Sequence, residues 1–314
     1  MESTKGVYIM KFLMFSDLHY APGWFYDSNL ETVRLFVRHA QEEGCDFILH
    51  AGDLCHGPSK VPELMEVLDN SPVPVYHCLG NHDTDGTPYK EVLQLYHMPD
   101  GHYYFDTCGY RIIVMDPNYC KIDDQYIHYD LGNYYQWPDK RNYTDPEQLV
   151  WLEKTIDDSP YPCLLVGHNS YEREVDGVRE YREVQDIIRR SNQKTRNKVL
   201  MVMTGHLHRD YICIVDNVIH WELNSVRYDW VGDPKHQGMF PQELYKKYEF
   251  MDDILPYSDP LHAVVTVEGT TVTIEGMEST MLNGVDRKSI GAELLDRSSR
   301  SVKPRIQSAK ITLG

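Results

Sequence analysis

Five short blocks of the sequence combine side chains that bind metal ions with a glycine or the end of an apolar run. They are Asp17-Leu18-His19, Gly52-Asp53, Gly80-Asn81-His82-Asp83, Gly167-His168 and Gly205-His206-Leu207-His208. Each block follows a predicted strand, and the carboxyl ends of strands are where α/β sheets bind their ligands. The donor atoms are oxygen and nitrogen without cysteine, and this set favours Mn, Fe or Zn over a soft-metal ion.

The number and order of these blocks carry more weight than any one of them. A single Gly-Asp or Gly-His pair occurs by chance, and a histidine beside an apolar strand is more often a core residue than a ligand. Five blocks after five separate strands are poorly explained in that way. Seven residues fill eight coordination positions if one carboxylate bridges two cations. Such cations, about 3.5–4 Å apart, would hold a hydroxide as nucleophile and clamp phosphoryl oxygens.

The ordered blocks resemble the signature of the calcineurin-like metallophosphoesterase superfamily over residues 17–208. The resemblance implies a four-layer αββα sandwich of two mixed β-sheets, with a dinuclear site at the sheet edge. It also implies two divalent or mixed-valence metal ions (Mn, Fe or Zn). The ligands that it implies are Asp17, His19 and His208 for the first metal, Asn81, His168 and His206 for the second, and Asp53 as the bridge.

The resemblance also gives roles to two residues that are not ligands. His82 matches the family's histidine that protonates the leaving oxygen or steadies the transition state, and Asp83 would orient it. An imidazole suits this role at neutral pH, because a neighbouring carboxylate moves its pKa easily. The alternative for Asp83 is a helix cap in the following turn.

Two positions indicate which branch of the family the sequence resembles. His19 stands where the cyclic-nucleotide phosphodiesterase-like branch has histidine, and His56 stands where purple acid phosphatases have tyrosine. A tyrosinate-iron centre is therefore not expected. His56 could contact phosphate or a water molecule near the metals, or it could be an ordinary loop histidine. Arg209 could hold a substrate phosphate as a bidentate donor or pair with Asp210.

The elements around the blocks predict an α/β fold, because strand-like runs alternate with helical patterns. The predicted strands are 7–15, 47–51, 73–79, 164–166 and 199–203, and the predicted hairpins are 103–115, 211–223 and 263–275. The predicted helices are 28–43, 61–68, 144–156 and about 174–190. Ser28 and Thr144 each precede a glutamate by three residues, which is typical of a capping box at a helix start.

One metallophosphoesterase domain is expected over residues 7–285, with long active-site loops near 117–142 and 226–260. Both loops are rich in aromatic residues, and loops this long usually have a function or cover a site. The alternative is that their tyrosines pack a small subdomain. Residues 286–314 have seven basic and three acidic residues. We expect this tail to pack on the domain, with helix-like residues 292–297 and an edge strand within 307–313, rather than to bind a partner as a polybasic arm.

Composition limits the partners and the compartment. The net charge of −17 repels nucleic-acid phosphates, so no nucleic-acid partner is expected. Seven cysteines without a CxxC pair indicate buried thiols in a reducing compartment. The sequence has neither a membrane-length apolar run nor a secretory signal pattern, so we expect a cytoplasmic protein without a membrane partner. No pattern indicates the oligomeric state.

These observations predict a metal-dependent hydrolase that cleaves phosphate mono- or diester bonds of small molecules by attack of a metal-bridging hydroxide. Nucleotides are expected among its substrates, because aromatic loop residues could stack on a base. One alternative is a nucleotide-linked pyrophosphohydrolase, although its lipid or alcohol substrates would favour an apolar cap over tyrosine-rich, acidic loops. A nuclease is disfavoured by the acidic charge. A catalytically silent binding scaffold is disfavoured because all seven ligand positions are filled.

Overall fold

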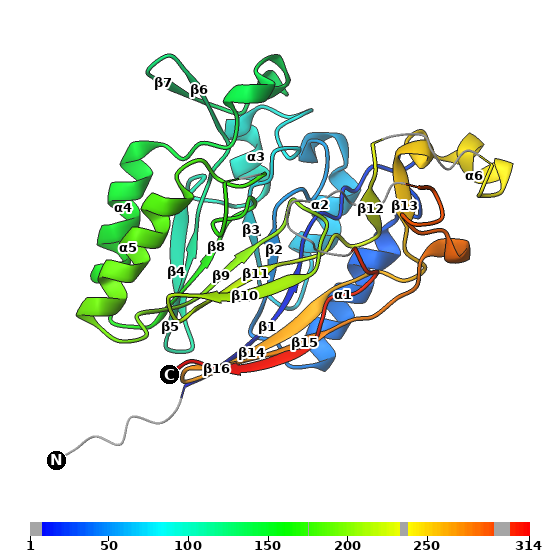
Figure 1. The fold of residues 1–314 in the computed structure, drawn as a ribbon. Coiled ribbons are helices and arrows are strands. Elements are labelled where there is room, and N and C mark those ends of the chain that lie inside the picture. Colours follow the sequence, from blue (N-terminus) through cyan, green and yellow to red (C-terminus); the bar gives the residue numbers. More distant parts are fainter. Residues whose placement is uncertain (1–7, 175, 233–237, 292–301) are drawn as a thin grey trace.

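The computed structural model describes residues 8–174, 176–232, 238–291 and 302–314, and its centre is a pair of six-stranded mixed β-sheets (Figure 1). In the first sheet, three N-terminal strands run parallel and three C-terminal strands join them antiparallel. Its strands, in spatial order, are β16 (Ala309–Thr312), β15 (Thr271–Gly276), β14 (Ala263–Glu268), β1 (Ile9–Phe15), β2 (Phe47–Ala51) and β3 (Val75–Cys78).

The second sheet has a parallel centre with one antiparallel strand at each edge. Its strands, in spatial order, are β10 (Tyr211–Val215), β11 (Val218–Glu222), β9 (Val199–Thr204), β8 (Cys163–Val166), β5 (Tyr110–Val114) and β4 (Tyr103–Thr107). Every residue of β8 and β9 is buried. A strand covered on both faces needs apolar residues throughout, which explains these uninterrupted apolar runs.

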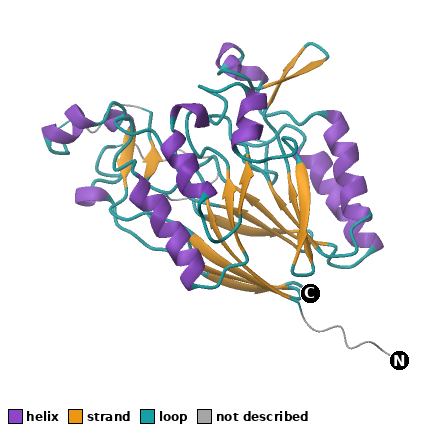
Figure 2. Ribbon diagram, turned by 180° about the vertical axis from the view of Figure 1, so that it is seen from behind, coloured by secondary structure: helices purple, strands orange, loops and turns teal. Residues whose placement is uncertain are grey.

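Helices cover the outer face of each sheet, and the two inner faces pack against each other (Figures 1 and 2). The helices on the first sheet are α1 (Leu30–Glu42) and α2 (Pro62–Asp69), and those on the second are α4 (Pro146–Asp157) and α5 (Tyr181–Lys194). One apolar cluster joins Phe12 and Leu49 of the first sheet to Val166 and Met203 of the second. The predicted αββα sandwich is therefore confirmed.

Three predicted helix starts are wrong. Asn29, not Ser28, caps α1 by accepting from Thr32 N, while the Ser28 hydroxyl accepts a bond from Ala21 N. Asp145 caps α4 because Pro146 occupies the first helical position, where proline is favoured. Helix α5 begins at Tyr181 instead of about residue 174.

The two long loops contain short elements that the sequence did not predict. Residues 117–142 hold a hairpin and two turns of 3-10 helix: β6 (Tyr119–Ile122), β7 (Gln125–His128), η2 (Asn133–Gln136) and η3 (Pro138–Lys140). Residues 226–260 hold β12 (Tyr228–Trp230), α6 (Gln242–Lys247), η4 (Met251–Asp253) and β13 (Ile254–Pro256). Two more short helices, η1 (Pro58–Lys60) and α3 (Tyr89–Leu95), follow β2 and β3, and η5 (Leu282–Gly284) precedes the tail.

The described part of the tail adds β16 to the edge of the first sheet, beside β15. This confirms the edge strand predicted within 307–313, whereas the helix predicted over 292–297 lies outside the described residues. Within the described ranges, every helix is too short or too polar to span a membrane.

Candidate metal centre

All seven predicted ligands lie together where the strands of both sheets end. Asp17 and Asp53 follow β1 and β2, while His168 and His206 follow β8 and β9. Five of the seven have a positive φ of 47° to 69°, a region that residues other than glycine rarely adopt. Such backbone strain is found mainly at functional sites, where the surrounding structure maintains it. The five are Asp17, His19, Asp53, His206 and His208.

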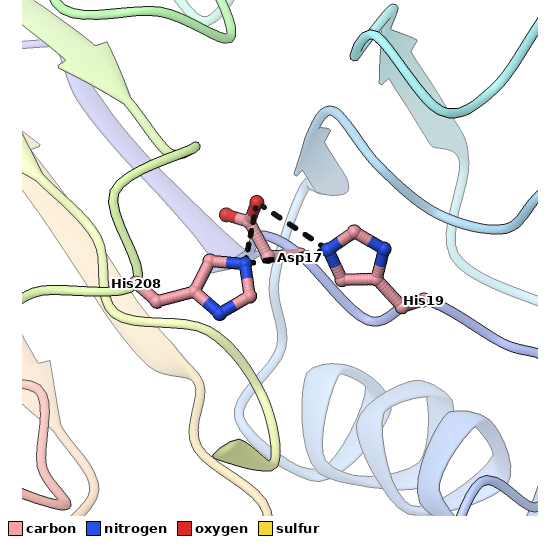
Figure 3. A group of neighbouring side chains, drawn as sticks. All are labelled: Asp17, His19 and His208. Atoms are coloured by element: carbon pink, nitrogen blue, oxygen red, sulfur yellow. Dashed lines mark hydrogen bonds and ion pairs between the residues drawn. The ribbon is translucent and has the colours of Figure 1, made fainter. Parts of the chain in front are cut away.

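Three side chains form the first group (Figure 3). The Nε2 atoms of His19 and His208 are 3.3 Å apart. They lie 3.9 Å and 3.3 Å from Asp17 Oδ1, and Figure 3 shows both rings directed at this carboxylate from different sides. The three side chains are buried. One cation could contact all three, as the sequence predicted.

The second group contains Asp53, His168 and His206, whose ligand atoms lie within 4.8 Å of one another. Asp53 Oδ2 lies 3.1 Å from His168 Nε2 and 3.7 Å from His19 Nε2, so this oxygen faces both groups. Asn81 belongs to the same edge, and its amide nitrogen donates to the Tyr134 hydroxyl at 3.4 Å. Its oxygen therefore points away from that bond.

Hydrogen bonds behind the ligands orient the atoms that face the cluster. Nδ1 of His168 lies 2.9 Å from the Ala51 carbonyl oxygen, and Nδ1 of His208 lies 3.2 Å from that of Tyr228. A carbonyl only accepts, so both nitrogens carry hydrogen and Nε2 is free to bind a metal. Asp17 Oδ2 accepts from the Ser16 hydroxyl and from His206 N, which leaves Oδ1 for the cluster. Metal-binding histidines are usually held in this way.

The donor set fits two hard or borderline cations. Three of its atoms are fully buried and have no hydrogen-bond partner in the described structure: Asp17 Oδ1, Asn81 Oδ1 and His168 Nε2. Buried polar atoms without partners are rare in folded proteins, and a bound ion is one of their explanations. Of these, Asp17 Oδ1 and His168 Nε2 face other predicted ligands, since they lie 3.3 Å from His208 Nε2 and 3.1 Å from Asp53 Oδ2.

The charges of the cluster also suit cations. Burial would raise the pKa of Asp17, but His208 and His168 outweigh it and hold the pKa well below its usual range. Asp53 is shifted downward in the same way, chiefly by His168 and then His82. Burial lowers the pKa of His206 to about 3, so its ring is neutral. Burial opposes the shift at His168, but Asp53 and Asp17 raise its pKa to about 10, so a cation there would replace the Nε2 proton. Ionised carboxylates and neutral imidazoles are the forms that bind metals.

The glycines of the blocks leave no room for a side chain because the backbone passes close to the site, as Gly52 and Gly205 illustrate. At Gly52, φ is +96° and a Cβ atom would collide with the His168 ring. At Gly205, a Cβ atom would collide with the Ser16 hydroxyl. Any larger residue at either position would displace a ligand or a group that orients one.

The structure separates the two residues predicted to act beside the metals. His82 lies at the cluster and donates its backbone N–H to Asp53 Oδ1. Asp83 does not reach the His82 ring, because its carboxylate accepts from the backbone N–H groups of Gly80, Asp53 and Leu54. Its role is therefore to hold the two ligand loops together, and it caps no helix.

Asp85 is the carboxylate that contacts His82, and the sequence reasoning missed it. Its Oδ2 lies 2.6 Å from His82 Nδ1 and 3.2 Å from His56 Nδ1. His56 in turn lies 3.2 Å from Nδ1 of the ligand His19. The signal available in the sequence was spacing, because Asp85 N bonds to His82 O in a turn that brings residues three apart side by side.

A cavity of about 900 Å³ opens over the cluster. This volume is in the range of small-molecule sites. One wall is aromatic, with Phe25 and Phe250 stacked at 5.4 Å and Trp24 and Trp230 beside them. Another part of the lining comes from the loop 117–142 and includes Leu131 and Tyr135. The lining also includes Arg141, Leu207 and Arg209.

The seven ligands, their oriented rings and the cavity over them agree with a comparison of sequences. The profile of the calcineurin-like phosphoesterase family matches residues 10–210, more than half of the chain. The chain belongs to the calcineurin-like phosphoesterase family. Membership agrees with the predicted class, a metal-dependent phosphoester hydrolase, and the matched residues include all seven predicted ligands.

Individual relatives match over a smaller part of the chain than the family profile does, or at low sequence identity. A manganese-dependent ADP-ribose/CDP-alcohol diphosphatase of Arabidopsis thaliana is 29% identical over 107 residues. The match covers 30% of this chain and 34% of the relative, so it spans about a third of that protein.

Two solved structures share the fold. A dimetal phosphatase from Danio rerio superposes with a TM-score of 0.62 and 13% identity, over 98% of this chain and 100% of its own. GAP50, described as the anchor in the inner membrane complex of Plasmodium, has a TM-score of 0.55 and 12% identity over 98% and 90% of the two chains. At these identities the likeness shows the fold alone.

Proposed function

We propose that this protein is a hydrolase of small phosphoesters that works with two metal ions. The observation that carries the proposal is the position of Asp53 Oδ2, which faces His19 on one side and His168 on the other. One metal would be held by Asp17, His19, His208 and Asp53. The other would be held by Asn81, His168, His206 and Asp53.

When bound, the two ions would activate water and neutralise charge on the phosphoryl oxygens. His82 would supply the proton that the leaving oxygen takes up, since Asp85 fixes one side of its ring and the other side lines the cavity. Asp17 and Asp53 are ionised by their surroundings and anchor the cations at the strand ends.

We infer that the substrates are small molecules that contain a nucleotide. The aromatic wall offers ring faces on which a base could stack, since Trp24 is 39% exposed and Trp230 is 44% exposed. Arg141 and Arg209 line the same cavity and could contact phosphate oxygens. The net charge of −17 disfavours long nucleic acids, so the nucleotide would be a free one.

A second candidate is cleavage of the diphosphate bond in a nucleotide-linked molecule. The name of the Arabidopsis relative favours it, because that protein is called an ADP-ribose/CDP-alcohol diphosphatase. Its manganese dependence also makes Mn²⁺ the first metal to test here. The lining of the cavity also offers Trp24, Phe25, Trp230 and Phe250 as an aromatic surface for the nucleotide part of such a substrate.

The setting of the protein is inferred from its thiols and its topology. The seven cysteines are free thiols and five of them are buried, which supports a reducing, cytoplasmic compartment. We propose that residues 7–285 form one catalytic domain and that the tail packs on it through β16.

A substrate panel tests the proposal. Protein stripped of metal and reloaded with Mn²⁺ would be assayed on ADP-ribose, an aryl phosphate monoester and the corresponding bis-aryl diester. Preference for ADP-ribose would support diphosphate cleavage, and preference for the diester would support a phosphodiesterase. No turnover of any of the three by protein with two bound metals would contradict a hydrolase and favour a binding scaffold.

A further inference from the structure

We propose that Asp85 is the positioning residue of the site, and that through His56 it links the proton donor His82 to the metal-facing histidine His19. This inference rests on the proposed function, because it assigns His82 its task. It differs from the sequence prediction, which gave the orienting role to Asp83.

The first step is the hydrogen-bond pattern around the Asp85 carboxylate. Oδ2 lies 2.6 Å from His82 Nδ1 and 3.2 Å from His56 Nδ1. An ionised carboxylate can only accept, so both Nδ1 atoms carry hydrogen. In His56, Nε2 is then the nitrogen that faces another partner, and in His82, Nε2 is left for the substrate.

The second step follows from His56 and sets the orientation of a ligand. His56 Nε2 has no hydrogen when Nδ1 of the neutral ring carries one, so it accepts. Its neighbour at 3.2 Å is His19 Nδ1, which must therefore donate. The lone pair of His19 is then on Nε2, the atom that lies 3.3 Å from His208 Nε2 and faces the metal group. One carboxylate thus sets the hydrogen positions of His82 and His56 directly, and that of His19 through His56.

The third step is that the carboxylate is itself held in place by the loop 117–142. The Tyr134 hydroxyl donates to Asp85 Oδ1 at 3.0 Å, and the Tyr135 hydroxyl lies 3.3 Å from Oδ2. The Asp85 side chain is only 15% exposed. The loop therefore fixes the orientation of His82 as well as forming a wall of the cavity.

The chemical task of this arrangement is delivery of one proton. Water supplies the oxygen that bonds to phosphorus, the bond from phosphorus to the leaving oxygen breaks, and its electron pair stays on that oxygen. The attacking water releases a proton to the solvent, and the leaving oxygen takes the Nε2 proton of the imidazolium form of His82, which leaves the ring neutral with its hydrogen on Nδ1, bonded to Asp85. Asp85 touches no reacting atom, so at saturating metal, where the bound ion itself holds His19, its effect on turnover appears only where the leaving group needs that proton.

Kinetics with two leaving groups separate this role from a structural one. Asp85→Asn should lower kcat by about 10–100-fold for an alkyl phosphate diester, and much less for a bis-aryl diester whose leaving group needs little proton transfer. His82→Gln should show the same selectivity, and the double variant should be no worse than His82→Gln alone. Equal losses on both substrates, or additive losses, would overturn the proposal.

A matched control changes one nearby charge without touching the histidines. Asp139 is exposed in η3 of the same loop, and Asp139→Asn should leave both rates unchanged. A loss in this variant similar to that of Asp85→Asn would show that charge alone is responsible, which would overturn the assignment.

A spectroscopic readout does not need turnover. Nitrogen-15 NMR of histidine-labelled, metal-stripped full-length protein, at a pH where the rings are neutral, should show His82 and His56 with hydrogen on Nδ1. In Asp85→Asn the His82 ring should lose this preference. Hydrogen on Nε2 of His82 in the unmodified chain would overturn the proposal. A chain that hydrolyses no phosphoester would contradict the proposed function, and the ring spectra would still decide the role of Asp85.

Discussion

The seven predicted ligands at the strand ends, called the metal-binding edge below, and the aromatic wall of the same cavity are built in different ways. The edge consists of side chains at the ends of buried strands, and five of its seven ligands have a backbone that only a rigid surrounding can maintain. The wall comes from segments far apart in the chain, residues 24–25, 230 and 250, and the bond from Arg287 to Asp229 holds the segment next to Trp230. The edge should therefore determine whether any phosphoester is cleaved, and the wall should determine which one.

The largest effect should come from the edge. Asp53→Asn removes the carboxylate that faces both metal groups, so kcat should fall by about 1,000-fold on every substrate, equivalent to several kcal/mol. Metal content per chain should fall with it, as measured by mass spectrometry of the purified protein. Asp123→Asn, an exposed carboxylate after β6, is the matched control. Loss on one substrate only would break the comparison.

The ion pair between Arg287 and Asp229, which is next to Trp230 of the aromatic wall, is the next test. Arg287 donates to both oxygens of the buried Asp229 carboxylate, at 2.5 Å and 2.7 Å, and to the Trp230 carbonyl. Arg287→Met leaves this carboxylate without its cation, so the free energy of unfolding should fall by about 2 kcal/mol. Denaturant unfolding measures it. Adding Asp229→Asn should restore part of the loss, and no restoration would show that the pair is not the cause.

The wall itself should affect binding and not the chemical step. Trp24→Ala should raise KM for ADP-ribose by about 10-fold, because stacking on a base is worth about 1–3 kcal/mol. The KM for an aryl phosphate monoester should not change. Trp24→Phe keeps an aromatic face and serves as the control. A fall in kcat on both substrates would mean that the wall also contributes to the chemical step, contrary to the comparison.

The smallest effect should be pH-dependent and confined to the loop 117–142. His128 Nε2 lies 2.7 Å from Asp116 Oδ2 at the base of this loop. Burial would lower the pKa of His128, but the Asp116 carboxylate outweighs burial and raises it. The stabilisation is complete below the unfolded pKa of about 6.5 and is lost as pH rises through the folded pKa.

The stability difference between the unmodified chain and His128→Gln should therefore be largest below about pH 6.5 and should shrink as the pH rises through the raised pKa of His128. Denaturant unfolding at several pH values measures this difference. Exposed His97 pairs with Asp69, and His97→Gln is the control that should show little change. A difference that grows with pH would contradict the assigned ion pair.

The sequence predicted the edge because strand ends can be recognised from apolar runs and glycine. It could not assign Asp83 and Asp85 correctly, since both carboxylates follow His82 and only the turn decides which one reaches its ring. For the tyrosines of the loop 117–142, the sequence left two roles open, packing within the loop and contact with the substrate. The structure shows packing for Tyr134, which is buried and bonds to Asp85, and it leaves Tyr135 exposed in the lining of the cavity.

The central claim is that two metal ions at the strand ends carry the chemistry. Metal-stripped protein would be titrated with Mn²⁺ while the initial rate of ADP-ribose or bis-aryl diester hydrolysis and the bound metal are followed together. The rate should start near zero and rise until two ions are bound per chain. A full rate without metal, or a rate that is complete with one ion, would contradict the account.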